Sequence, residues 1–148
     1  MALKQQIQQD LIAAMKAKEE VKVSALRMLK AAILKFETSG DRKEASDSDI
    51  LTILGREVKQ RKDAMEGFKS GGRPEMAANE EAEMVILQTY LPEQMNEDDL
   101  RKVIQETIAE VGATSKADMG KVMGALMPKV KGKADGGMVN KLVGDFLN

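Results

Sequence analysis

The sequence of 148 residues contains no cysteine and no histidine. Without cysteine the chain can form no disulfide, no thiolate nucleophile and no sulfur-ligated metal site. Without histidine it lacks the commonest general base and the commonest transition-metal ligand. A hydrolase built from this chain would therefore need a serine–lysine arrangement or paired carboxylates.

Two further absences concern charge and apolar runs. Lys and Arg total 23 and Asp and Glu total 24, so the net charge is −1 and no overall field draws the chain toward nucleic acid or an anionic membrane. A polyanion site would have to be a local patch. No apolar run approaches the length of a membrane span, and Met1–Lys18 is too charged for a signal peptide. We therefore expect a cytoplasmic protein without a membrane partner.

What the sequence does contain is helical periodicity with clear start and stop signals. Four apolar stripes at helical spacing fill the first two thirds of the chain. The polar run Lys16–Glu20 separates the first two stripes and predicts a bend or short turn near Lys18. Ser46 with Asp49 is typical of a helix start, and Pro74 of a first helical residue. The expected helices cover about residues 3–15, 21–38, 47–70 and 74–91.

A break at Leu91–Met95 separates these helices from a group of shorter ones. Asn96 with Asp99 predicts the start of the fifth helix, and Gly112 predicts its end. Two further stripes predict a sixth helix over about 119–130 and a seventh over about 138–146. Nothing alternates like a strand. The predicted fold class is all-α, a four-helix N-terminal bundle (1–92) followed by a three-helix C-terminal bundle (96–148).

The segment Gly112–Val143 is the most locally specified part of the chain. In the helix expected over about 119–130, one side is an apolar stripe. The opposite side is nearly bare backbone with one cation. Such a surface suits close approach by a polyanion. The alternative is that Gly120 and Gly124 let another helix pack closely. The residues of the bare side are Ala117, Gly120, Lys121, Gly124, Ala125 and Pro128.

Charge in this segment is locally positive. Between Thr114 and Lys141 there are six lysines and two acidic residues. Lysine contacts to phosphate release counterions and make binding salt-dependent. No aromatic residue lies between Gly112 and Lys141, which disfavours a stacking platform for single strands and favours recognition of folded RNA by shape and backbone. The candidate RNA-binding residues are Lys121, Lys129, Lys131, Lys133, Lys141, Gly120, Gly124 and Gly136.

Motifs of nucleotide binding and nucleophilic catalysis do not match. Gly120-Lys121 is not a P-loop, because Ser115 and Val122 stand where glycine and serine or threonine are required. Ser115 and Lys116 are neighbours, and adjacent helical side chains diverge, so Ser115 is expected to be a cap. We expect no catalytic residue and no cofactor.

Charged side chains elsewhere are expected to be structural. The acidic groups Glu80–Glu83 and Glu97–Asp99 are predicted in first helical turns or on solvated faces, so no metal site is expected. Arg61 falls on the apolar stripe of the third helix. We expect its stem to lie on the core and its head at the rim of the bundle.

Two runs in the tail resemble the module shared by the YqeY proteins and the B subunit of the bacterial tRNA-dependent amidotransferase. They are Ala117–Gly124 (ADMGKVMG) and Lys131–Val143 (KGKADGGMVNKLV). Two shorter marks occur upstream, Lys59–Ala64 and Tyr90–Gln94. The resemblance runs from about Leu3 to the last residue and is that of a stand-alone YqeY protein.

The resemblance implies an all-helical fold with a tail that helps to hold the body of tRNA. The partners that it implies are tRNA or another structured RNA, and a tRNA-dependent amidotransferase or aminoacyl-tRNA-related protein. Two other functions stay open. One is an accessory protein of glutamine-dependent amide formation on misacylated tRNA, a carbon–nitrogen ligase reaction with glutamine as the amido-nitrogen donor. The other is a helical protein–protein adaptor.

Overall fold

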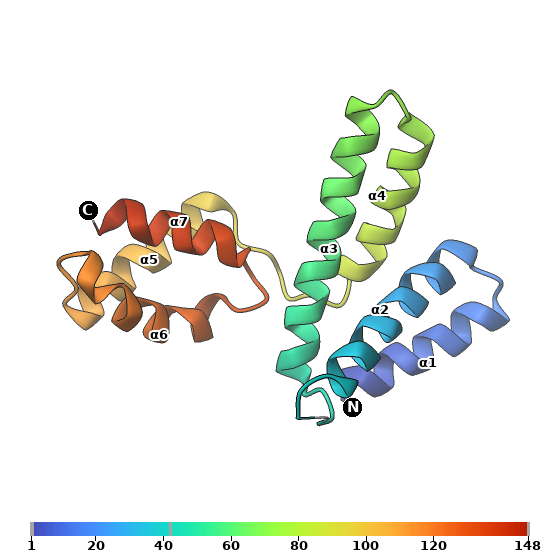
Figure 1. Ribbon diagram of the computed structural model, residues 1–148, viewed down its shortest axis with the longest axis horizontal. Helices are drawn as coiled ribbons and strands as arrows, with labels where there is room; N and C mark the ends of the chain where they lie inside the picture. The colour runs from blue at the N-terminus through green and yellow to red at the C-terminus, as the bar shows by residue number, and fades with distance from the viewer. Residues whose placement is uncertain (1, 42, 148) are drawn as a thin grey trace. The chain divides into compact units, whose positions relative to one another are not determined.

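The computed structural model describes residues 2–41 and 43–147. Within these ranges the chain forms seven α-helices, one short 3-10 helix and no strand (Figure 1). The prediction of an all-α protein is confirmed. The chain divides into two compact units, the first ending at Leu91 and the second beginning at Pro92.

The first unit contains four helices, and local signals set their ends. The predicted turn near Lys18 is present. Lys18 adopts a left-handed conformation there, with φ of 58°. Ser46 and Asp49 form the predicted capping box, and Pro74 is the first residue of the fourth helix. The helices are α1 (Leu3–Lys16), α2 (Glu20–Thr38), α3 (Asp47–Ser70) and α4 (Pro74–Gln88).

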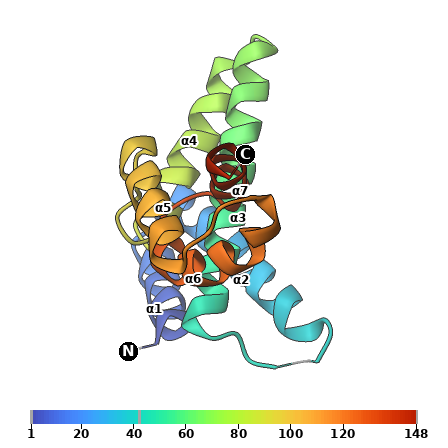
Figure 2. The ribbon, with the colours of Figure 1, turned by 90° about the vertical axis from the view of Figure 1, so that its left-hand side faces the viewer.

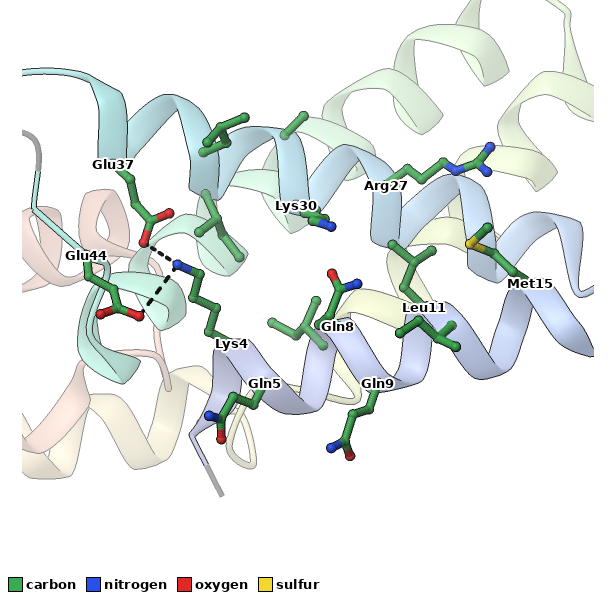
Figure 3. A pocket seen from close by; sticks show the side chains of 15 residues that line it. Lys4, Gln5, Gln8, Gln9, Leu11, Met15, Arg27, Lys30, Glu37 and Glu44 are labelled. Atoms are coloured by element: carbon green, nitrogen blue, oxygen red, sulfur yellow. Dashed lines mark hydrogen bonds and ion pairs between the residues drawn. The ribbon is translucent and has the colours of Figure 1, made fainter.

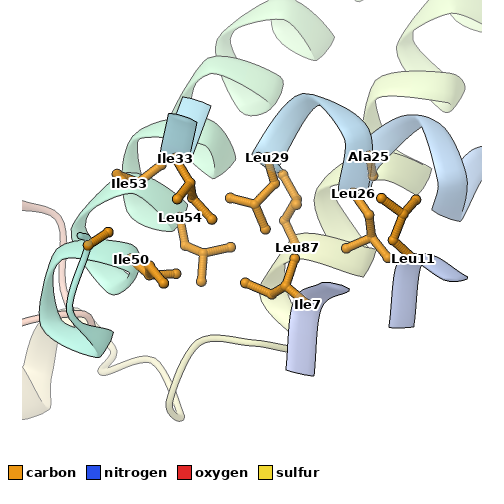
Figure 4. Packing of buried hydrophobic residues seen from close by; sticks show 11 residues of the cluster. Ile7, Leu11, Ala25, Leu26, Leu29, Ile33, Ile50, Ile53, Leu54 and Leu87 are labelled. Atoms are coloured by element: carbon orange, nitrogen blue, oxygen red, sulfur yellow. The ribbon is translucent and has the colours of Figure 1, made fainter. Parts of the chain in front are cut away.

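The core of the first unit is aliphatic and draws on all four helices. Ile7 and Leu11 come from α1, and Leu87 comes from α4. Figure 4 shows these side chains converging with those of α2 and α3. Leu29 and Leu54 have no exposed surface. Burial of these apolar side chains is the main favourable contribution to the folding of this unit.

Arg61 of α3 departs from the prediction that its head lies at the rim. It is only 6% exposed. Its Nε lies 3.3 Å from Glu83 Oε2 and 3.7 Å from Glu80 Oε2 on α4. Ser24 Oγ donates a 2.7 Å hydrogen bond to Glu83, and Arg61 Nη2 contacts Met28 Sδ at 3.1 Å. These five residues form the arginine cluster, which joins α2, α3 and α4 around the buried Arg61.

The prediction for the two carboxylates in this cluster is therefore also wrong. Glu80 and Glu83 were expected at a helix start or on a solvated face, yet their side chains are only 25% and 17% exposed. The physical reason is the hairpin of α3 and α4, which lie side by side (Figure 1). This packing turns one face of α4 toward Arg61, a partner that spacing within α4 cannot indicate.

Tyr90, just after α4, connects the end of this hairpin to α1. Its hydroxyl donates a 2.6 Å hydrogen bond to Asp10 Oδ2. Burial raises the pKa of the Tyr90 phenol above its ordinary value, and the hydrogen bond to Asp10 raises it further. The neutral phenol is therefore the form that the folded unit holds.

The second unit has its own aliphatic core. At the start of its first helix, α5, Asn96 Oδ1 accepts a 2.8 Å hydrogen bond from the Asp99 amide. Gly112 ends α5 in the left-handed conformation with φ of 69°. Three helices in mutual contact supply the residues of the buried cluster. Figures 1 and 2 show these helices as ribbons. They are α5 (Glu97–Val111), α6 (Met119–Val130) and α7 (Gly136–Phe146), with the 3-10 helix η1 (Lys116–Asp118) leading into α6.

Candidate nucleic-acid interface

The loop before α6 is held by the carboxylate of Asp118. Asp118 Oδ2 accepts hydrogen bonds from the backbone amides of Thr114 at 2.9 Å and Ser115 at 3.4 Å. These two bonds lower the pKa of Asp118 below its ordinary value, and the nearby Lys121 ammonium lowers it further. The carboxylate is therefore ionised near neutral pH, where it satisfies free amides at the start of the helix.

One face of α6 is open backbone. Gly120 and Gly124 are exposed, and a Cβ atom added at either position would meet no heavy atom within 4 Å. The alternative in which these glycines accommodate a closely packed helix requires them to be buried, which is the opposite of what the structure has. The other face of α6 points into the core through Val122, Leu126 and Val130.

The backbone of this face also offers a hydrogen-bond acceptor. Pro128 lies inside α6 and has no amide hydrogen. The carbonyl of Gly124 therefore lacks the donor that a helix normally supplies four residues later. This oxygen points along the helix toward Pro128, which is itself exposed.

The lysines of the segment differ in what they contact. Lys121 is exposed on α6. Lys129 is not free, because its Nζ lies 2.7 Å from Glu110 Oε2 and 3.0 Å from Thr107 Oγ1 on α5. The role expected for Lys129 as a free cation therefore changes to a link between α5 and α6. Its spacing on α6 could not indicate this pairing, because both partners belong to another helix.

Lys131 and Lys133 lie in a loop that the start of the second unit holds in place. The Gln94 side-chain amide donates a 2.7 Å hydrogen bond to the carbonyl of Gly132, and the Met95 amide donates a 2.9 Å bond to that of Lys133. Both lysine side chains are exposed. No local pattern indicates this role for Gln94, although Gln94 belongs to the run Tyr90–Gln94 that carries part of the resemblance.

The remaining predicted residues belong to α7. The Asp135 carboxylate accepts a 3.3 Å hydrogen bond from the Met138 amide at the helix start. Gly136 is exposed and open, whereas a Cβ at Gly137 would come within 3.2 Å of that carboxylate. Lys141 is exposed further along the helix. The loop that carries Lys131 and Lys133 directly follows α6 in the chain, and Lys141 lies on the next helix, α7.

Comparison with known families agrees with the motifs in this unit. The sequence model of the family described as Yqey-like protein matches residues 4–147. The chain belongs to the YqeY-like family. The match extends over nearly the whole chain, so both units are part of the family's common sequence.

Three curated relatives of this YqeY-like chain share one name, "Altered inheritance of mitochondria protein 41, mitochondrial". The protein of Pyrenophora tritici-repentis is 24% identical over 95% of this chain and 78% of its own length. The proteins of Eremothecium gossypii and Saccharomyces cerevisiae are 32% and 33% identical over 57% and 55% of this chain. The chain spans less than half of these two, 46% and 44% of their lengths.

The cytoplasmic location expected from the sequence is wrong by this comparison, because these relatives carry mitochondrial names. The expectation rested on the lack of an apolar span and of a recognisable signal. Aqueous compartments on either side of an organelle membrane present a folded chain with the same solvent. Composition therefore does not distinguish between them.

None of the helices in residues 2–41 and 43–147 combines the length and the apolar character that crossing a bilayer requires. In the same ranges, no three carboxylate, imidazole or thiol side chains are grouped so that they could hold a metal ion. The groups that the α6 surface and its loop offer a ligand are lysine ammonium groups and backbone atoms.

Proposed function

We propose that this chain is a non-catalytic module that binds tRNA or another folded RNA through the basic surface of its second unit. The observation that carries the proposal is the open face of α6, where Gly120 and Gly124 are exposed and have no neighbour within 4 Å of a Cβ position. This face of α6, which we call the glycine floor, has no side chain at Gly120 and Gly124 and therefore lets a phosphodiester chain approach closely.

The groups around this floor suit a ribose–phosphate backbone. Lys121, Lys131 and Lys133 are exposed, and none has an ion pair among the described residues. Their ammonium groups would neutralise phosphates. The carbonyl of Gly124 would accept a hydrogen bond from a ribose 2′-hydroxyl, the group that distinguishes RNA from DNA. Contacts of these kinds position a nucleic acid without reading its bases.

We also propose the finer architecture that the sequence predicts, a four-helix bundle over 1–92 and a three-helix bundle over 96–148. The second would correspond to the tail module that it resembles in the amidotransferase B subunit. An association with a tRNA-dependent amidotransferase, and hence with glutamine-dependent carbon–nitrogen ligase chemistry, would then run through shared tRNA. In this proposal the chain supplies RNA contacts and the partner supplies the chemistry.

A salt titration with unfractionated tRNA tests the lysines. We expect saturable binding by fluorescence anisotropy, with an affinity that falls as salt rises. Lys131→Ala and Lys133→Ala should each lower the slope of log affinity against log salt by about one. Lys129→Ala should change the slope less, because Glu110 already pairs with its ammonium. Lys102→Ala, an exposed lysine of α5 in the same unit, is the matched control and should have no effect.

The glycine floor provides a second arm of the same experiment. Gly124→Leu should abolish tRNA binding by steric exclusion while the helical circular dichroism is retained, since the new side chain extends into open space. Gly55→Leu in α3 is the matched control, because a Cβ at Gly55 also meets nothing within 4 Å. Absence of saturable binding, or slopes that the Lys131 and Lys133 changes leave untouched, would contradict the proposal.

A further inference from the structure

An open groove runs between α1 and α2 in the first unit (Figure 3). It has a volume of about 1200 Å³. Its apolar lining includes three large side chains with substantial exposure, Ile12 at 42%, Met15 at 48% and Leu34 at 59%. These are three of the eight large apolar residues that are exposed in residues 2–41 and 43–147. Exposed apolar surface is therefore concentrated in this groove, and such concentration marks a binding surface.

The two ends of the groove differ in charge. At one end Lys4 Nζ lies 2.7 Å from Glu37 Oε2 and 3.7 Å from Glu44 Oε1. Figure 3 shows this group at one end, with Arg27 toward the other. The hydrogen bond between Lys4 and Glu37 raises the pKa of the lysine and lowers that of the carboxylate. The cation at this end is therefore already neutralised by the protein itself.

The other part of the groove has cations without anions. Arg27 and Lys30 line it from α2, and neither makes an ion pair with another described residue. They are three residues apart, so they lie on one face of α2 about one helical turn from each other. Two unpaired cations beside exposed Met15 and Leu34 favour a ligand that is apolar on one side and carries acidic groups along the edge of that side.

We propose that this groove binds an amphipathic helix of a partner protein, with apolar side chains on Ile12, Met15 and Leu34 and two acidic side chains on Arg27 and Lys30. A third helix fits a channel between two helices when its apolar residues recur at helical spacing. Carboxylates spaced by one turn on that helix match the spacing of the two cations. The site is on the first unit and is independent of the RNA surface proposed for the second.

The test uses a designed peptide of about the length of α1, labelled with fluorescein. Leucines form one stripe, and two glutamates one turn apart flank it. A matched peptide carries lysines in place of the glutamates. The 148-residue chain should bind the glutamate peptide more tightly than the lysine peptide, and amide shifts in the NMR spectrum should fall on the facing surfaces of α1 and α2.

Charge exchange is the decisive comparison. The double variant Arg27→Glu, Lys30→Glu should bind the glutamate peptide about tenfold more weakly and the lysine peptide more tightly than the wild type does. Lys35→Glu changes an exposed lysine of α2 outside the groove and should alter neither affinity. Leu34→Gln should weaken binding, whereas Val85→Gln, at a residue with 52% exposure on α4, should not.

Three results would overturn the proposal. The first is no binding of either peptide, or amide shifts outside α1 and α2. The second is binding of both peptides with equal affinity, or binding that the double variant leaves unchanged. The third is self-association of the wild-type protein in sedimentation that Leu34→Gln abolishes, because the occupant would then be a second copy of the chain.

Discussion

Replacing Arg61 with alanine is expected to lower the free energy of unfolding of the first unit by about 3–5 kcal/mol. The change removes the only cation of the arginine cluster and leaves Glu80 and Glu83, which are 25% and 17% exposed, without the guanidinium that both approach. A buried carboxylate without a partner costs far more than the ion pair contributes. Urea denaturation followed by circular dichroism measures the loss. Arg56→Ala, at an exposed arginine of the same helix, should change the value by less than about 0.5 kcal/mol.

Replacement of the whole ion cluster should have a much smaller effect. Arg61 Nε and Glu80 Oε2 are buried without a hydrogen bond, so the geometry does not fully offset desolvation. A triple variant with Arg61→Met, Glu80→Leu and Glu83→Gln removes the charges together and keeps an acceptor for Ser24. It should recover most of the stability that Arg61→Ala loses. An Arg61→Ala protein as stable as Arg56→Ala would show that water reaches these carboxylates.

The second large effect is expected in the other unit. Leu126 has no exposed surface and lies in the buried cluster of α5, α6 and α7. Leu126→Ala should lower the free energy of unfolding of this unit by about 3 kcal/mol, from lost burial and from the cavity left behind. Hydrogen exchange of the backbone amides measures it, with loss of protection in α5, α6 and α7. Leu34→Ala, at a residue with 59% exposure, is the control and should leave protection there unchanged.

The same experiment examines the division of the chain into two units. The two buried clusters have no residue in common. Amides of α1 to α4 should therefore keep their protection in Leu126→Ala. An equal loss of protection in α2 and α3 would show that the chain unfolds as one cooperative body.

Helix boundaries were the part of the fold that sequence predicted best, because their signals are local. Ser46 and Asp49 are three residues apart, as are Asn96 and Asp99, and each pair makes its hydrogen bond within one turn. The ion pairs of Arg61 are a feature that local sequence signals do not predict. The spacing of Arg61 placed it on the apolar stripe of α3, but its neutralisation depends on carboxylates from α4 that pack against it in the folded unit.

The candidate site shows the same limit. Periodicity grouped Gly120 with Gly124 on one face of α6, but it could not tell whether another helix covers that face. The structure leaves both glycines exposed. Lys129 and Lys131 looked alike as cations in sequence. They differ because Glu110 and Thr107 of α5 lie within reach of Lys129.

The hydrogen bond from Tyr90 to Asp10 also gives the protein a built-in optical reporter. Tyr90 is the only tyrosine and the sequence has no tryptophan, so emission from intact protein excited near the tyrosine absorption band comes from this ring, apart from the weak signal of three phenylalanines. A carboxylate that accepts a hydrogen bond from the phenol quenches tyrosine emission. Unfolding of the first unit separates the ring from Asp10 and should brighten the protein, while events confined to α5, α6 and α7 leave the emission unchanged.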